Sequence, residues 1–69
     1  MKKKVLLQLV GIDSNAYMIL GAFKKAARRQ GWTPEEIDPV IKEAMSGGYD
    51  HLLATILDNV DMPEDEEEA

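Results

Sequence analysis

The sequence of 69 residues contains no cysteine and only one histidine, His51. Disulfide bonds and thiolate metal sites are therefore excluded, and one imidazole cannot form a histidine-rich metal site. A domain of this length buries a small core, usually worth only about 3–5 kcal/mol of net stability. We therefore expect a single domain without metal or cofactor, held together by apolar packing.

Long apolar runs are also missing. The start, MKKKVLLQLVGI, is basic and then apolar, as in a signal peptide, but Gln8 interrupts an apolar run of only about six residues. No small-residue cleavage site follows, and about 20 apolar residues are needed to span a bilayer. The lack of cysteine also fits a reducing compartment. These features predict a soluble cytoplasmic protein that does not contact membranes.

Residues arranged for catalysis are scarce. His51 lies beside Asp50 and near Ser46 in the sequence, but a triad formed within one turn would have no oxyanion hole. The acidic run 64–68 lacks the glycine and the alternating spacing of a calcium loop. The sequence predicts a protein that is not an enzyme and has no catalytic, metal or cofactor residues.

Charge, in contrast, is abundant and segregated. Residues 1–31 hold seven basic residues and one acid, a balance of +6, whereas residues 32–69 hold one lysine and twelve acids, a balance of −11. This asymmetry favours an electrostatic partner for either half. The alternative is that the two halves attract each other, within the fold or in a dimer.

The end of the chain is acidic and lacks apolar periodicity. We therefore predict a single helical domain over 1–62 and a disordered acidic tail over 63–69.

The segment 14–30 is predicted to form the central helix. Its apolar residues recur at the spacing of one helical face: Ala16, Ile19, Leu20, Phe23, Ala26 and Ala27. Asp13 or Ser14 can cap its start, and Gly31 suits the left-handed position after its end. Four cations cluster in its last turns, where the helix dipole favours positive charge: Lys24, Lys25, Arg28 and Arg29.

A second helix is predicted from Pro34 to Ser46. Thr33 and Glu36 have the spacing of a capping box, with Pro34 at the first helical position. Trp32 and Ile37 have the spacing of a hydrophobic staple. Pro39 either kinks this helix or restarts it, because it lacks an N–H group.

A third helix is predicted after the turn at 46–48, with Gly47 left-handed and Asp50 as the N-cap. Its apolar stripe comprises Leu52, Leu53, Ile56, Leu57 and Val60, opposite His51, Thr55, Asp58 and Asn59.

The segment 5–10, VLLQLV, predicts a short strand that is apolar on both faces. Its pairing partner stays open between an antiparallel return through 59–62 and the same strand of a second copy. Without either partner, the segment would be an extended arm or part of a helix. The predicted fold class is mainly α: a compact three-helix domain with one short N-terminal strand or extended arm.

The chain resembles a group of small proteins of tailed bacteriophages and prophages. The resemblance covers roughly residues 5–60 and rests on KVLLQLVG, GIDSNAYMILGAFKKAARRQGWTPEEID and SGGYDHLLATILDNV. Ser14, Pro39 and Gly48 depart from the pattern, which affects turn geometry. The group has no established activity, so the resemblance implies a phage or bacterial host cytoplasm and no catalytic residue.

Together these features predict a small phage- or prophage-type accessory protein that binds another protein, of the host or the phage. The predicted interaction surface comprises Lys24, Lys25, Arg28 and Arg29, together with Leu6 and Gln8 at the strand edge.

Two alternatives stay open. One is a nucleic-acid-binding accessory protein whose basic helix end contacts phosphates. The next helix begins Thr-Pro-Glu-Glu, and this acidic start would repel DNA from a helix-turn-helix arrangement. The other is a self-associating module, such as a homodimer formed through the N-terminal strand.

Overall fold

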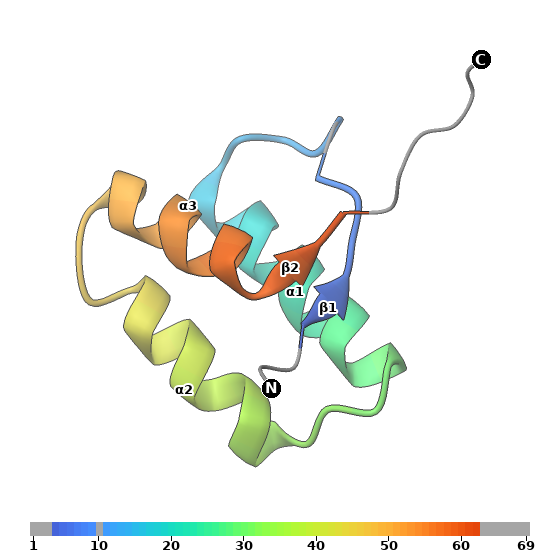
Figure 1. Ribbon diagram of the computed structural model, residues 1–69. Helices are drawn as coiled ribbons and strands as arrows, with labels where there is room; N and C mark the ends of the chain where they lie inside the picture. Colours follow the sequence, from blue (N-terminus) through green and yellow to red (C-terminus); the bar gives the residue numbers. More distant parts are fainter. Residues whose placement is uncertain (1–3, 10, 63–69) are drawn as a thin grey trace.

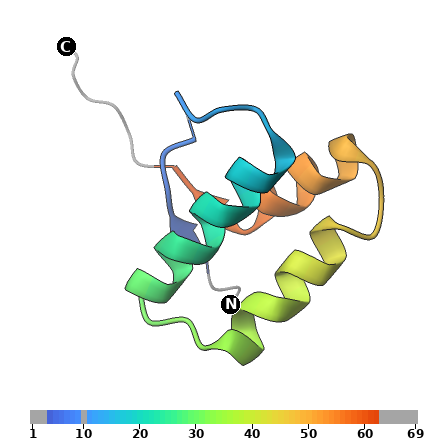
Figure 2. The same cartoon turned by 180° about the vertical axis from the view of Figure 1, so that it is seen from behind.

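Three helices pack around one core in the computed structural model, which describes residues 4–9 and 11–62 (Figure 1). The elements are β1 (Val5–Leu6), α1 (Ala16–Arg29), α2 (Pro34–Ala44), α3 (Tyr49–Asp58) and β2 (Val60–Asp61). In Figure 1, α3 and the two strands lie in front of α1, and the reverse view in Figure 2 places α1 in front. The predicted mainly α, three-helix fold with a short N-terminal strand is confirmed. The predicted acidic tail, 63–69, lies outside the described residues.

The core lies between α1 and the layer formed by the other elements. Buried apolar side chains come from every element and from the α1–α2 connection: Val5, Ile19, Leu20, Phe23, Ala27, Trp32, Ile37, Ala44, Leu52, Ile56 and Val60. At its centre the rings of Phe23 and Trp32 meet edge to face, with centroids 5.8 Å apart. The predicted inner face of α1 is confirmed, because its apolar residues are buried or half-buried.

The first helix starts later than predicted, and its cap is Asn15. The Asn15 side chain accepts a hydrogen bond from the Tyr17 N–H at 2.9 Å, so the prediction of Asp13 or Ser14 as cap is wrong. Asp13 instead accepts a bond from the Asn15 N–H at 3.0 Å and orders the cap itself. Gly31 follows the helix with a φ of +93°, as predicted.

The second helix begins with the predicted capping box. The Thr33 N–H donates to Glu36 Oε1 at 2.8 Å. Pro39 lies inside the helix, which continues without a break to Ala44. Pro39 and Glu35, the residue that would receive its missing hydrogen bond, are both exposed, so water can reach the unpaired carbonyl. A restart of the helix at Asp38 is therefore not observed.

The third helix departs from prediction in its cap and in its buried face. Gly48 is the N-cap instead of Asp50, and Gly47 has no left-handed φ. Leu57 is 46% exposed, whereas the predicted outer residues Thr55 and Asn59 are buried. The reason is that both polar residues face α2, and the Asn59 amide donates to the Thr55 carbonyl at 2.9 Å. This bond satisfies two polar groups that would otherwise be costly to bury.

The N-terminal strand is shorter than predicted and pairs within the chain. Val5 aligns with Val60 and Leu6 with Asp61 in a parallel ladder, with the Val5 N–H donating to the Asn59 carbonyl at 2.9 Å. The predicted location of the partner was right, but its antiparallel direction was wrong. The prediction that both faces of the strand are covered is also wrong, because Leu6 is 54% exposed. Val10 lies outside the described residues.

Candidate functional site: the outer face of α1

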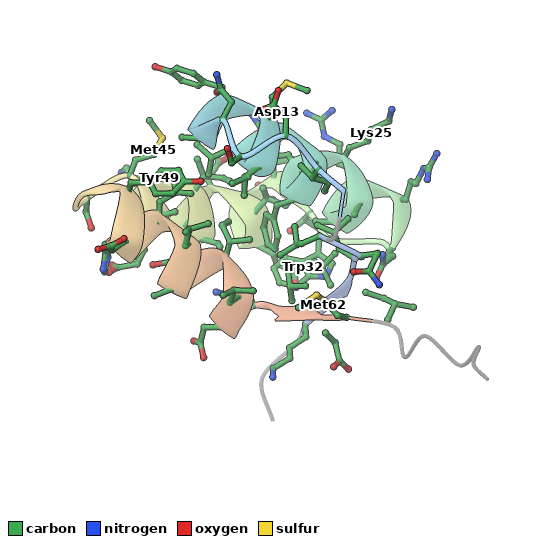
Figure 3. All side chains as sticks on the ribbon, turned by 90° about the horizontal axis from the view of Figure 1, so that it is seen from above. Asp13, Lys25, Trp32, Met45, Tyr49 and Met62 are labelled. Atoms are coloured by element: carbon green, nitrogen blue, oxygen red, sulfur yellow. The ribbon has the colours of Figure 1, made fainter. Side chains whose placement is uncertain are left out.

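The side of α1 that points away from the core carries an uninterrupted group of exposed residues. We call it the outer face; it comprises Tyr17, Met18, Gly21, Lys24, Lys25, Arg28 and Arg29. Helical spacing places these positions opposite the buried Ile19, Phe23 and Ala27. Figure 3 shows Lys25 projecting away from Trp32 and the core. The structure therefore brings all four predicted cations onto one accessible surface.

The C-terminal half of the outer face is strongly basic. Its four cations and Gly21 line a shallow groove of about 570 Å³. Lys24 and Arg28 are four positions apart, as are Lys25 and Arg29, and like charges at this spacing cost about 0.2–0.5 kcal/mol per pair. The helix dipole offsets part of that cost. Among the described residues, none of these four cations forms an ion pair with an acidic side chain. The described part of the acidic half of the chain therefore makes no ion-pair contact with this basic cluster.

The N-terminal half of the outer face is apolar, and the sequence reasoning missed it as a candidate surface. Tyr17 is 79% exposed and Met18 is 54% exposed. Both residues fall outside the apolar spacing that predicted the inner face. This misfit was the available signal, because apolar residues off the core face leave apolar surface exposed to solvent.

A small apolar groove adjoins this half, where the start of α1 meets the α2–α3 turn. Tyr17, Met45 and Tyr49 line it, together with the buried Leu20 and Leu52, and its volume is about 300 Å³. Figure 3 shows Met45 and Tyr49 at the opposite end of the molecule from Lys25. The Tyr49 hydroxyl donates to the Ser14 carbonyl at 2.5 Å, which joins α3 to the segment before α1.

The edge of β1, the other predicted surface, is occupied by Gln30. The Leu6 N–H donates to Gln30 Oε1 at 2.9 Å, and Gln30 Nε2 donates to the Leu6 carbonyl at 2.8 Å. This side-chain amide takes the place that a neighbouring strand would fill. Leu6 therefore offers no open backbone edge. Gln8 is exposed but lies beyond the end of the strand.

His51 takes part in a surface contact between two helices. Its Nε2 lies 2.8 Å from Glu43 Oε2, so the start of α3 is joined to the end of α2. The Ser46 hydroxyl donates to the Glu43 carbonyl at 2.7 Å and not to the imidazole. Within residues 4–9 and 11–62, no three histidine or acidic side chains are grouped as metal ligands would be. No helix in the same ranges combines the length and apolar character needed to cross a membrane.

Comparison with protein-family models, with curated proteins and with solved structures found no match.

Proposed function

We propose that this protein is a non-enzymatic accessory protein that binds another protein through the outer face of α1. The observation that carries the proposal is the cluster of four exposed cations, none of which has an acidic partner among the described residues. An acidic surface on the partner would relieve the repulsion between these cations. Such complementarity speeds association and selects the partner.

The expected strength of these contacts is modest. An exposed ion pair contributes about 0.2–1 kcal/mol, and salt screens it over about 8–10 Å at physiological ionic strength. The four cations therefore steer and orient the partner, while most of the affinity has to come from apolar contacts. A phage or prophage setting, and the cytoplasm as location, stay predictions from the sequence.

The test is a pull-down from bacterial lysate with the wild-type chain and two charge-reversal variants. Lys25→Glu changes the outer face, and Lys42→Glu makes the same change at an exposed position of α2. Lys25→Glu replaces an attraction of up to about 1 kcal/mol by a similar repulsion, so we expect binding to weaken by up to about 30-fold. Lys42→Glu should bind as the wild type does.

Two results would count against the proposal. One is the recovery of no protein above background while circular dichroism shows a folded chain. The other is an equal loss of the partner with Lys25→Glu and Lys42→Glu, which would mean that net charge matters and the outer face does not.

Nucleic-acid binding is the second candidate function, and the accessibility of the same four cations favours it. Against it, α2 begins with Glu35 and Glu36 just after the basic end of α1. Retardation of a DNA or RNA duplex at low salt, abolished by Lys25→Glu and unaffected by Lys42→Glu, would support this candidate. No retardation at low salt would remove it.

A further inference from the structure

We infer that the segment bound by this protein is an acidic, amphipathic α-helix that crosses α1 at Gly21. The inference rests on the proposed function and adds the chemistry and geometry of the partner. Three features of the outer face support it: a glycine at its centre, two exposed apolar side chains at one end and the cations at the other.

Gly21 has no explanation within the fold. Glycine in a helix interior costs about 0.5–1 kcal/mol relative to alanine. Positive φ does not require it here, because the described glycines with positive φ are Gly11 and Gly31. Packing does not require it either, since a Cβ at Gly21 would meet no atom within 4 Å. What the missing side chain provides is bare backbone at the centre of the outer face.

Bare backbone at this point permits a close approach by a second helix. Packed helices usually lie about 8–10 Å apart, depending on the side chains at the crossing point. With glycine there, the partner's axis can come to the short end of that range. Tyr17 lies one turn before Gly21, and Lys25 lies one turn after it. The apolar and the basic halves of the outer face therefore flank the crossing point.

The shape and backbone of α1 favour a helix over an extended strand. The backbone N–H and C=O groups in the middle of α1 are bonded within the helix, so no open edge is available for strand pairing. The outer face runs from Tyr17 to Arg29, which at about 1.5 Å per residue is roughly 18 Å. A helix of about three to four turns matches that length.

The chemistry of the outer face specifies both sides of the partner helix. Tyr17 and Met18 are exposed and would pack against apolar side chains of the partner helix. Tyrosine and methionine are enriched in the centres of interfaces. The four cations call for carboxylates. A short acidic helix can stay on this surface, whereas a long polyanion would extend toward the acidic start of α2 at Glu35 and Glu36.

The test is a selection from a displayed library of helical peptides of about four turns, against the full chain. The library has apolar residues at helical spacing and randomised Asp, Glu, Lys and Arg elsewhere. Enriched peptides should be acidic. Gly21→Leu should weaken their binding by at least about tenfold, since it adds bulk at the crossing point.

The key control separates blocked binding from loss of folding. Gly21→Leu should fold at least as stably as the wild type, because leucine is a better helix former and its Cβ meets open space at this exposed position. Ala54→Leu adds bulk at an exposed position of α3 and should bind normally.

The outcomes distinguish the inference from the proposed function. Loss of peptide binding with Lys25→Glu but not with Gly21→Leu would overturn the crossing point and leave the proposed function standing. Unchanged peptide binding with Lys25→Glu would overturn the inference, and unchanged binding of the lysate partner with Lys25→Glu as well would overturn both. A library that yields no acidic helix, or tighter binding of a nucleic-acid duplex than of any selected peptide at about 0.15 M salt, would overturn the inference.

Discussion

Replacement of Gln30 by alanine should weaken the attachment of the N-terminal strand and open its outer edge. Gln30 makes two hydrogen bonds to the Leu6 backbone, at 2.9 and 2.8 Å. Each is worth about 0.5–1.5 kcal/mol net. Leu6 is 54% exposed, so water replaces part of what is lost. We expect Gln30→Ala to lower the free energy of unfolding by about 1–2 kcal/mol, a large share for a domain of this size.

Three measurements check this prediction. Urea denaturation gives the change in stability, and amide hydrogen exchange should show faster exchange at Leu6. Sedimentation velocity at increasing concentration should show self-association of Gln30→Ala, because an open strand edge is a template for pairing. Lys24→Ala, an exposed truncation on the same helix, should change stability by less than about 0.5 kcal/mol.

The reasoning is refuted if Gln30→Ala keeps wild-type stability and slow exchange at Leu6. A strictly monomeric Gln30→Ala with faster exchange would refute only the role of Gln30 in blocking self-association. Gln30→Glu adds a graded test. Its carboxylate can still accept from the Leu6 N–H but cannot donate to the Leu6 carbonyl, so it should fall between wild type and Gln30→Ala.

Two further predictions concern the backbone. Gly31→Ala should destabilise the fold by about 1 kcal/mol, because the φ of +93° strains any residue with a Cβ, although no atom lies within 4 Å of that Cβ. An unchanged urea midpoint would contradict this. Pro39→Ala should stabilise the fold by about 1–2 kcal/mol, since the new N–H can bond to the Glu35 carbonyl in the middle of α2. A lower melting temperature for Pro39→Ala would contradict this. It would show that proline stabilises the fold more, by restricting the unfolded chain, than the new hydrogen bond does.

Local signals predicted the helices well. The capping box of Thr33 and Glu36 and the left-handed Gly31 depend on residues a few positions apart, so the sequence contains all the interacting groups. The inner face of α1 was predicted for the same reason, because the 3.6-residue period puts its apolar residues on one side. The basic half of the candidate site was visible as a cluster of four cations in six residues.

Interactions between distant residues could not be predicted. Gln30 and Leu6 are 24 positions apart, and nothing in either local sequence indicates that an amide would occupy the strand edge. The parallel direction of β2 depends on how three helices return the chain to β1. The burial of Thr55 and Asn59 depends on which side of α3 meets α2.

By itself, the sequence determined the number of helices, the capped start of α2 and the position of the basic cluster, because these follow from spacing and capping along one short segment. Tertiary structure alone decided which surfaces are available. It covered the edge of β1 with Gln30 and left the outer face of α1 accessible, with Tyr17 and Met18 beside the cations. Availability depends on what packs against each element, and that is a property of the whole fold.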